Sequence, residues 1–200
     1  MGDRTEASNR KVVRQCLENH LLLDEVVAGL QAPEAALVGD CAEVLTEVAR
    51  DNPTLVVPYS DSLSALLVHK NSRVRWEATH ALALIATSAP AKISLLVPIL
   101  VQLIRTDHSV IVRDHATDAL ANYASTGAAA AECVYPYLIE MLTLWDGKQA
   151  GHALQGLTYA VPFLPSRYDE LNVIAAEYSL SERAVVRKAA RRLHKLIYAH

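Results

Sequence analysis

The chain has 200 residues, of which 52% are hydrophobic and 20% charged, and its formal net charge is −3. This length suits one sizeable domain or a short repeat array, and the composition excludes a disordered chain. The slightly acidic balance excludes a protein that binds phosphate over its whole surface, although a local basic patch remains compatible with it.

Residues 1–8 are polar and lack the apolar core of a signal peptide, so we expect a loose lead-in there. No apolar run approaches the roughly 20 residues that span a bilayer, and we therefore expect no membrane partner and a cytoplasmic location. Cys16, Cys41 and Cys133 are too widely spaced for a disulfide framework or a zinc module. They fit small buried residues in a reducing compartment.

Apolar residues at helical spacing, separated by proline and turn signals, predict helices along the rest of the chain. The expected helices cover 9–30, 34–50, 54–69, 74–87, 95–104, 112–124, 132–145, 148–161, 166–179 and 183–198. They form about five antiparallel pairs in a single domain over 9–200, with approximate repeats 9–50, 53–88, 90–125, 128–162 and 165–198.

Two features recur with a steady period. Alanines suited to close helix packing follow one another at steps of 36 to 38 residues, at Ala42, Ala78, Ala116, Ala153 and Ala190. The dipeptide Val-Arg opens the second helix of a pair at Val74-Arg75, Val112-Arg113 and Val186-Arg187. Such a period is typical of stacked helical hairpins, because no hairpin can bury its apolar face alone.

The stretch 96–124 resembles a HEAT repeat, with its proline-containing first helix, Asp107 in the turn, Val112-Arg113, and Ala116 and Ala119 in the second helix. The resemblance covers roughly residues 34–198 and implies an all-α, right-handed superhelix of the HEAT or armadillo type. It also implies a ladder between repeats, formed by Arg75, Asp107, Arg113 and Arg187. In the repeat 128–162, Ala150 replaces the arginine and the turn is short, so we expect looser stacking or a bend.

A helical wheel divides the helix 74–87 into a buried stripe and an opposite side. The stripe contains Val74, Ala78, Ala81, Leu82 and Ile85, and the opposite side Trp76, His80, Ala83 and Thr87. In HEAT-like solenoids the second helices line the concave surface. By this resemblance, the partner-binding residues would be Trp76, His80, Asp114, Asp118, Gln155, Lys188 and Arg192.

Charge changes along that surface from acidic to strongly basic. Asp114 and Asp118 would repel phosphate, so the pattern favours a protein or peptide partner over nucleic acid. We therefore expect a non-enzymatic binding scaffold, with a solvated face that binds no partner as the alternative. The basic residues of 183–198 could also cap the repeat array, or bind nucleic acid or an acidic partner.

A group of histidines and carboxylates is the strongest candidate for chemistry: His80, Asp114, His115, Asp118 and His152. Such groups can bind a metal or share a proton, but no ligand motif of tight spacing is present. We expect polar surface residues, with no catalytic residue, metal or cofactor. An enzyme or enzyme subunit, similar in fold to bilin lyases or to alkyl-base DNA glycosylases, remains the alternative function.

Overall fold

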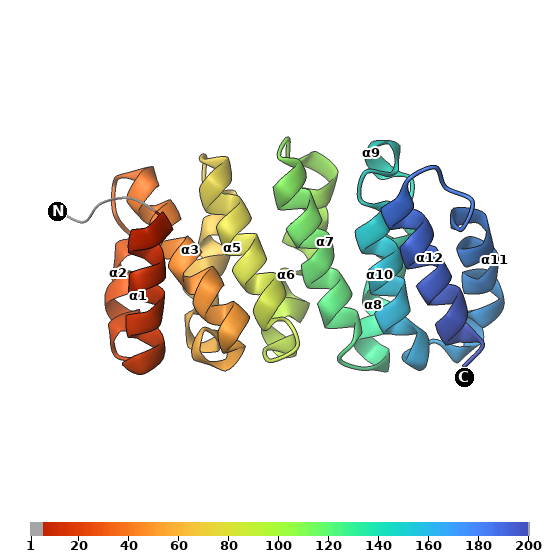
Figure 1. Cartoon of the computed structure of the whole chain (residues 1–200), viewed down its shortest axis with the longest axis horizontal. Helices are drawn as coiled ribbons and strands as arrows, with labels where there is room; N and C mark the ends of the chain where they lie inside the picture. The colour runs from red at the N-terminus through yellow and green to blue at the C-terminus, as the bar shows by residue number, and fades with distance from the viewer. Residues whose placement is uncertain (1–5, 200) are drawn as a thin grey trace. The chain divides into compact units, whose positions relative to one another are not determined.

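Helices are the only regular elements in residues 6–199, the part that this computed structural model describes (Figure 1). The expected lead-in over 1–8 lies outside the described residues up to position 5, and residues 6–8 already belong to the first helix. Compact packing divides the chain into two units, with the boundary in the sequence between Lys92 and Ile93. No helix in the described range is both long and apolar enough to cross a membrane.

The first unit is built around one long helix. Its helices are α1 (Glu6–Glu18), α2 (Leu22–Gly29), α3 (Ala35–Asp51), α4 (Ser60–Ala65) and α5 (Ser72–Ile85). Short 3-10 turns cover Pro53–Leu55, Val57–Tyr59 and Leu66–Val68. Helix α3 packs against α1, α2 and α5, so it forms the centre of this unit.

Two helices expected in the first unit are interrupted. The segment 9–30 forms α1 and α2 rather than one helix, and the side chain of Asn19 accepts a hydrogen bond from the Leu21 amide at the break. Such local side-chain bonds compete with the helical pattern. The segment 54–69 forms 3-10 turns around the short α4, because Pro53 and Pro58 supply no amide N–H and restrict the backbone.

The second unit places three second helices side by side. It contains most of α6 (Pro90–Thr106), then α7 (Val110–Ala124), α8 (Ala128–Glu140), α9 (Leu144–Gly147), α10 (Ala150–Ala160), α11 (Tyr168–Tyr178) and α12 (Ala184–Ile197). Two 3-10 turns, Val161–Phe163 and Pro165–Arg167, connect α10 to α11. Helix α10 packs against both α7 and α12, so these three lie in sequence across one face (Figure 1).

The periodic alanines all lie in the buried core. All five alanines are 0% exposed: Ala42, Ala78, Ala116, Ala153 and Ala190. The stripe predicted on α5 is likewise buried, but Ala83 was wrongly assigned to the open side and is only 3% exposed. In α10, an added Cβ on Gly156 would lie 2.9 Å from the Ala121 Cβ. Small residues therefore permit the close approach of α7 and α10.

Each of the three Val-Arg arginines forms a hydrogen bond with the loop of its own hairpin. In each, Nη1 donates to the carbonyl six residues earlier: Arg75 to His69 at 2.7 Å, Arg113 to Asp107 at 2.6 Å, and Arg187 to Ser181 at 2.8 Å. The Asp107 carboxylate accepts from the Ser109 amide at 2.8 Å, which shapes the same loop. These bonds lie within single hairpins, and the ladder between repeats stays a prediction.

The short turn in the repeat 128–162 has an unusual backbone. Trp145 and Asp146 adopt φ of 54° and 56°, a left-handed conformation that costs L-residues about 1–2 kcal/mol each. Trp145 Nε1 donates to the Ile104 carbonyl at 2.8 Å, and the Arg113 guanidinium lies 4.2 Å from its ring centroid. The indole thus anchors this strained turn to α6 and α7.

Candidate functional site

The exposed sides of α7, α10 and α12 form one surface in the second unit, which we call the second-helix face. Its predicted partner-binding residues are Asp114 and Asp118 on α7, Gln155 on α10, and Lys188 and Arg192 on α12. The first three are half-buried and the two cations are exposed. Because α10 lies between α7 and α12, carboxylates border one side of this face and cations the other.

Hydrogen bonds from α10 hold the acidic side of the face. His152 Nδ1 lies 2.6 Å from Asp118 Oδ1, and Gln149 Nε2 donates to Asp114 Oδ1 at 3.0 Å. The sequence had grouped His152 with Asp114, His115 and Asp118, and the structure brings His152 into contact with Asp118. It gave no signal for Gln149, which bonds Asp114. A hairpin period predicts which helices are neighbours but not the offset between two of them, so the pairing depends on the packed structure.

The two histidines next to Asp118 determine its protonation. Burial alone would raise the pKa of Asp118, but His152 and His115, the latter at 3.7 Å, outweigh burial and lower this pKa to about 2. The hydrogen bond to Asp118 raises the pKa of His152, against the opposing effect of burial. An ionised Asp118 can only accept, so His152 donates to it. The cluster is a charged pair whose proton sits on the histidine over a widened pH range.

Cations dominate the other side of the face. Helix α12 contains five lysines and arginines and no carboxylate. Its buried stripe is Val186, Ala190, Leu193 and Ile197. Directly opposite on the helix lie Lys188, Arg191, Arg192 and Lys195, all exposed. Among these four, the one hydrogen bond found in the described part of the chain is a long one, from Arg192 to Gln155 Oε1 at 3.4 Å.

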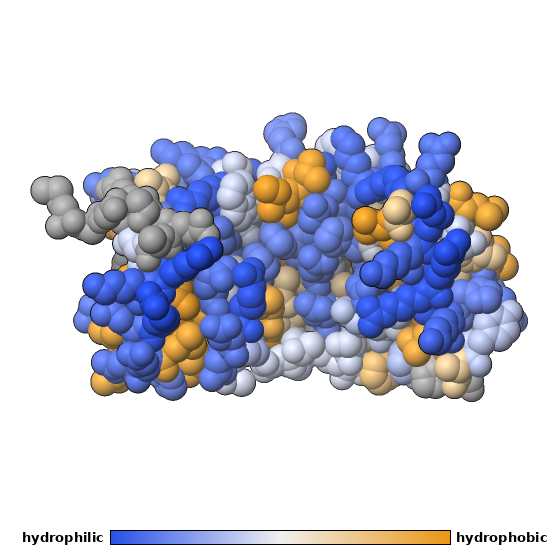
Figure 2. Space-filling view, viewed as in Figure 1, coloured by the Kyte–Doolittle hydropathy of each residue, from blue (hydrophilic) through white to orange (hydrophobic). Residues whose placement is uncertain are grey.

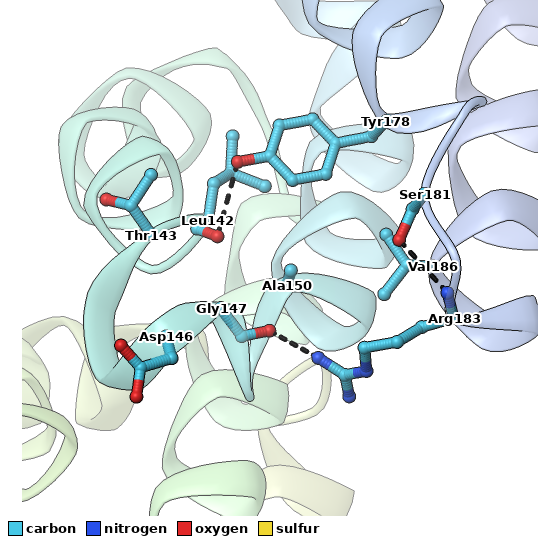
Figure 3. Close-up of a pocket in the computed structure, with 9 residues that line it drawn as sticks. All are labelled: Leu142, Thr143, Asp146, Gly147, Ala150, Tyr178, Ser181, Arg183 and Val186. Atoms are coloured by element: carbon cyan, nitrogen blue, oxygen red, sulfur yellow. Dashed lines mark hydrogen bonds between the residues drawn. The ribbon is translucent and has the colours of Figure 1, made fainter.

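A hollow of about 310 Å³ lies between the α9 turn and the loop that precedes α12 (Figure 3). Arg183 Nη1 donates to the Gly147 carbonyl at 2.5 Å across it, and the Tyr178 hydroxyl donates to the Leu142 carbonyl at 3.2 Å. These donors are used to join α11 and α12 to the preceding repeat. We therefore regard this hollow as part of the packing between repeats.

A second hollow, of about 610 Å³, opens where α7, α10 and α12 end. Tyr159, Pro162, Phe163 and Leu196 provide its apolar lining, and Arg192 and Lys195 its charges. Sequence reasoning missed it. The lining residues are spread over three segments of the chain, and only their packing brings them together.

In the first unit, Trp76 and His80 lie on α5 and are both half-buried. Trp76 Nε1 donates to Glu77 Oε1 at 2.7 Å. Burial raises the pKa of Glu77, although the bonds from Trp76 and Thr46 act in the opposite direction.

A charge cluster that the sequence did not single out connects α5 to α3. Arg73 Nη2 lies 2.8 Å from Asp40 Oδ1 and 2.6 Å from Glu43 Oε2. Arg73 lies on another helix, 33 positions from Asp40 and 30 from Glu43, so spacing alone gave no signal for the contact.

Within residues 8–199, no three or more His, Cys, Asp or Glu side chains are arranged to hold a metal ion. All three cysteines are free thiols. Cys16 is buried as expected, but Cys41 is half-buried and Cys133 exposed, so the expectation of burial was wrong for Cys133. Its position on α8 faces outward because Val134 and Ala130 occupy the core side of that helix.

Solved structures similar to this chain are helical repeat proteins. An engineered protein has a TM-score of 0.75 at 21% identity, with 96% of this chain and 90% of its own covered. A designed armadillo repeat protein in complex with the peptide (KR)4 has a TM-score of 0.75 at 17% identity and coverages of 96% and 92%. The archaeal HEAT-like repeats protein from Thermococcus onnurineus NA1 has a TM-score of 0.60 at 14% identity and coverages of 98% and 94%. No protein-family model matches the sequence, and no curated protein matches it.

Proposed function

We propose that this chain, which has the armadillo- and HEAT-like helical repeat fold, binds another protein or a peptide through the exposed sides of its second helices. The observation that carries the proposal is the second-helix face, where carboxylates on α7 and cations on α12 flank α10. In the first unit, Trp76 and His80 on α5 are the candidate contacts.

The dimensions of the face suit an extended peptide. Packed helices lie about 8–10 Å apart, so three adjacent helices present a surface roughly 20 Å across. An extended chain advances about 3.3 Å per residue, so a segment of about six residues crosses it. Opposite charges on the two sides favour a partner of mixed charge and give it one preferred direction.

The structural neighbours support a peptide-binding role without identifying the partner. One is a designed armadillo repeat protein in complex with (KR)4, and another was designed for modular peptide recognition. Sequence identity to both is below 20%, so the likeness concerns the fold. We extend only the use of a repeat surface for an extended chain to this protein.

A peptide-display selection against the full chain tests the proposal. Selected peptides are then measured by fluorescence anisotropy against Lys188→Glu/Arg192→Glu and against Trp76→Ala. Asp169→Lys and Val68→Ala serve as matched controls, because both positions are exposed and lie off the second helices. We expect at least one face variant to weaken binding about tenfold or more, and each control to change it less than twofold. Equal affinity in all the variants, or no selected peptide, would refute the proposal.

A further inference from the structure

The hollow of about 610 Å³ at the ends of α7, α10 and α12 combines an apolar lining with unused hydrogen-bond donors. Of its nine lining residues none is a carboxylate. Lys195 and the Tyr159 hydroxyl have no hydrogen-bond or ion-pair partner within the described part of the chain. Lys195 is exposed and Tyr159 is half-buried. A ligand that satisfies this lining must bring apolar surface together with an anionic group.

The cations continue from this hollow along α12. Lys188, Arg191, Arg192 and Lys195 form this cationic ridge. Lys188 lies in the second helical turn and Lys195 in the last, so the ridge is about 10 Å long at 1.5 Å per residue. About three extended peptide residues span that length. Hydrophilic surface covers α12, with smaller hydrophobic areas beside it (Figure 2).

Helix stability does not account for this arrangement. The helix dipole favours Lys195 in the last turn, but its effect falls off within that turn and does not account for Lys188, Arg191 or Arg192. Each of the four cations also lies three or four residues from two of the others, a spacing at which like charges repel one another. A mixed-charge surface would keep the last helix equally soluble, whereas this one gains most from an anionic partner.

Resting on the proposed peptide-binding function, we infer that the hollow and the ridge bind an acidic peptide segment. One or two bulky apolar side chains enter the hollow against Phe163 and Leu196, and two or three adjacent carboxylates pair with Arg192, Lys195 and the rest of the ridge. The volume of about 610 Å³ lies within the ordinary range for ligand pockets.

A peptide is favoured over a nucleic acid by the surroundings of the ridge. Asp114 and Asp118 lie on α7, separated from α12 only by α10. Their charges would repel a phosphate backbone that extended beyond one helix. A short peptide can place its carboxylates on the ridge alone and its apolar side chains in the hollow.

The test uses fluorescein-labelled peptides and the full chain, with anisotropy as the measurement. The probes are Asp-Glu-Asp-Phe-Leu and the reversed Leu-Phe-Asp-Glu-Asp, since the direction of the peptide is open. Asn-Gln-Asn-Phe-Leu removes the charges, and Asp-Glu-Asp-Ser-Ser removes the apolar side chains. We expect at least one probe to bind at least tenfold more tightly than both comparison peptides.

Protein variants then locate the site. Arg192→Gln/Lys195→Gln is expected to weaken the probe at least tenfold, and Phe163→Ala at least fivefold, with the helical circular dichroism unchanged. Lys148→Gln is the matched control, because Lys148 is an exposed cation of the same unit outside the hollow, and it should change affinity less than twofold.

Three outcomes would overturn the inference. These are equal binding of Asp-Glu-Asp-Ser-Ser, displacement of the probe by a thymidine oligonucleotide with a steep salt dependence, and sedimentation that shows a second copy of the chain occupying the site. If display selects peptides but the probe does not bind, this inference fails and the proposed function stands. If display selects none and the probe does not bind, both fail.

Discussion

The contact between His152 and Asp118 gives a pH-dependent test of the acidic side of the second-helix face. Replacing His152 by Gln keeps a polar side chain of similar size on α10 but removes the charge. The loss of unfolding free energy should be largest where both groups are charged. The raised pKa of His152 makes its contribution complete below the ordinary value of 6.5, and lost as the pH rises through the raised value.

The Asp118 carboxylate sets the lower limit of the pH range in which the pair is charged. The pKa of Asp118 falls from 3.8 to about 2, so its contribution is complete above 3.8 and disappears as the pH drops toward about 2. At about 1.4 kcal/mol per pKa unit, this change corresponds to about 2.4 kcal/mol. Asp118 is 32% exposed and shares the effect with His115, so we expect about 1–2 kcal/mol for His152→Gln at pH 5.5. At pH 9 the loss should be below about 0.5 kcal/mol, because a neutral histidine retains only the hydrogen bond.

Urea denaturation followed by circular dichroism at pH 5.5, 7 and 9 measures this difference. His108→Gln is the matched control, since His108 is an exposed loop residue of the same unit, and it should change stability by less than about 0.5 kcal/mol at each pH. A loss from His152→Gln that is the same at pH 5.5 and pH 9 would refute the charged pair. Such a result would mean that the side chain acts through packing alone.

Two further substitutions test the packing. Gly156→Ala should lower the free energy of unfolding, measured by thermal denaturation, by about 1–3 kcal/mol, because the new Cβ would lie 2.8 Å from Leu138 Cδ2. Gly151→Ala in the same helix is the control and should be close to neutral. Equal effects at the two positions would contradict the close approach of α7 and α10. Glu77→Gln should stabilise the chain at pH 8 and change its stability little at pH 4. Burial raises the pKa of Glu77, so its charged form is the one that costs stability. The amide oxygen of Gln can still accept the hydrogen bond from Trp76. A variant less stable than the wild type at pH 8 would show that the charge is needed there.

The sequence predicted the fold and the site to different degrees. Ala42 and Ala116 were informative in advance, because packing of paired helices imposes the same small residue in each repeat. Arg113 was singled out by its recurrence in three repeats, but its bond within its own loop was seen only in the structure. The break at Asn19 was not visible, since apolar residues continue at helical spacing on both sides of it. Local hydrogen bonding ended the helix where the apolar pattern did not.

The sequence by itself determined the helical repeat architecture, the buried alanines and the charged character of α12, all of which follow from periodicity and composition. Only the tertiary structure decided that His152 and Gln149 bond the α7 carboxylates. It also brought Phe163 and Lys195 to one hollow. The physical reason is that a repeat period identifies neighbouring helices, whereas the offset and rotation between them depend on side-chain packing. Side chains that meet across helices are therefore known only once the helices are packed.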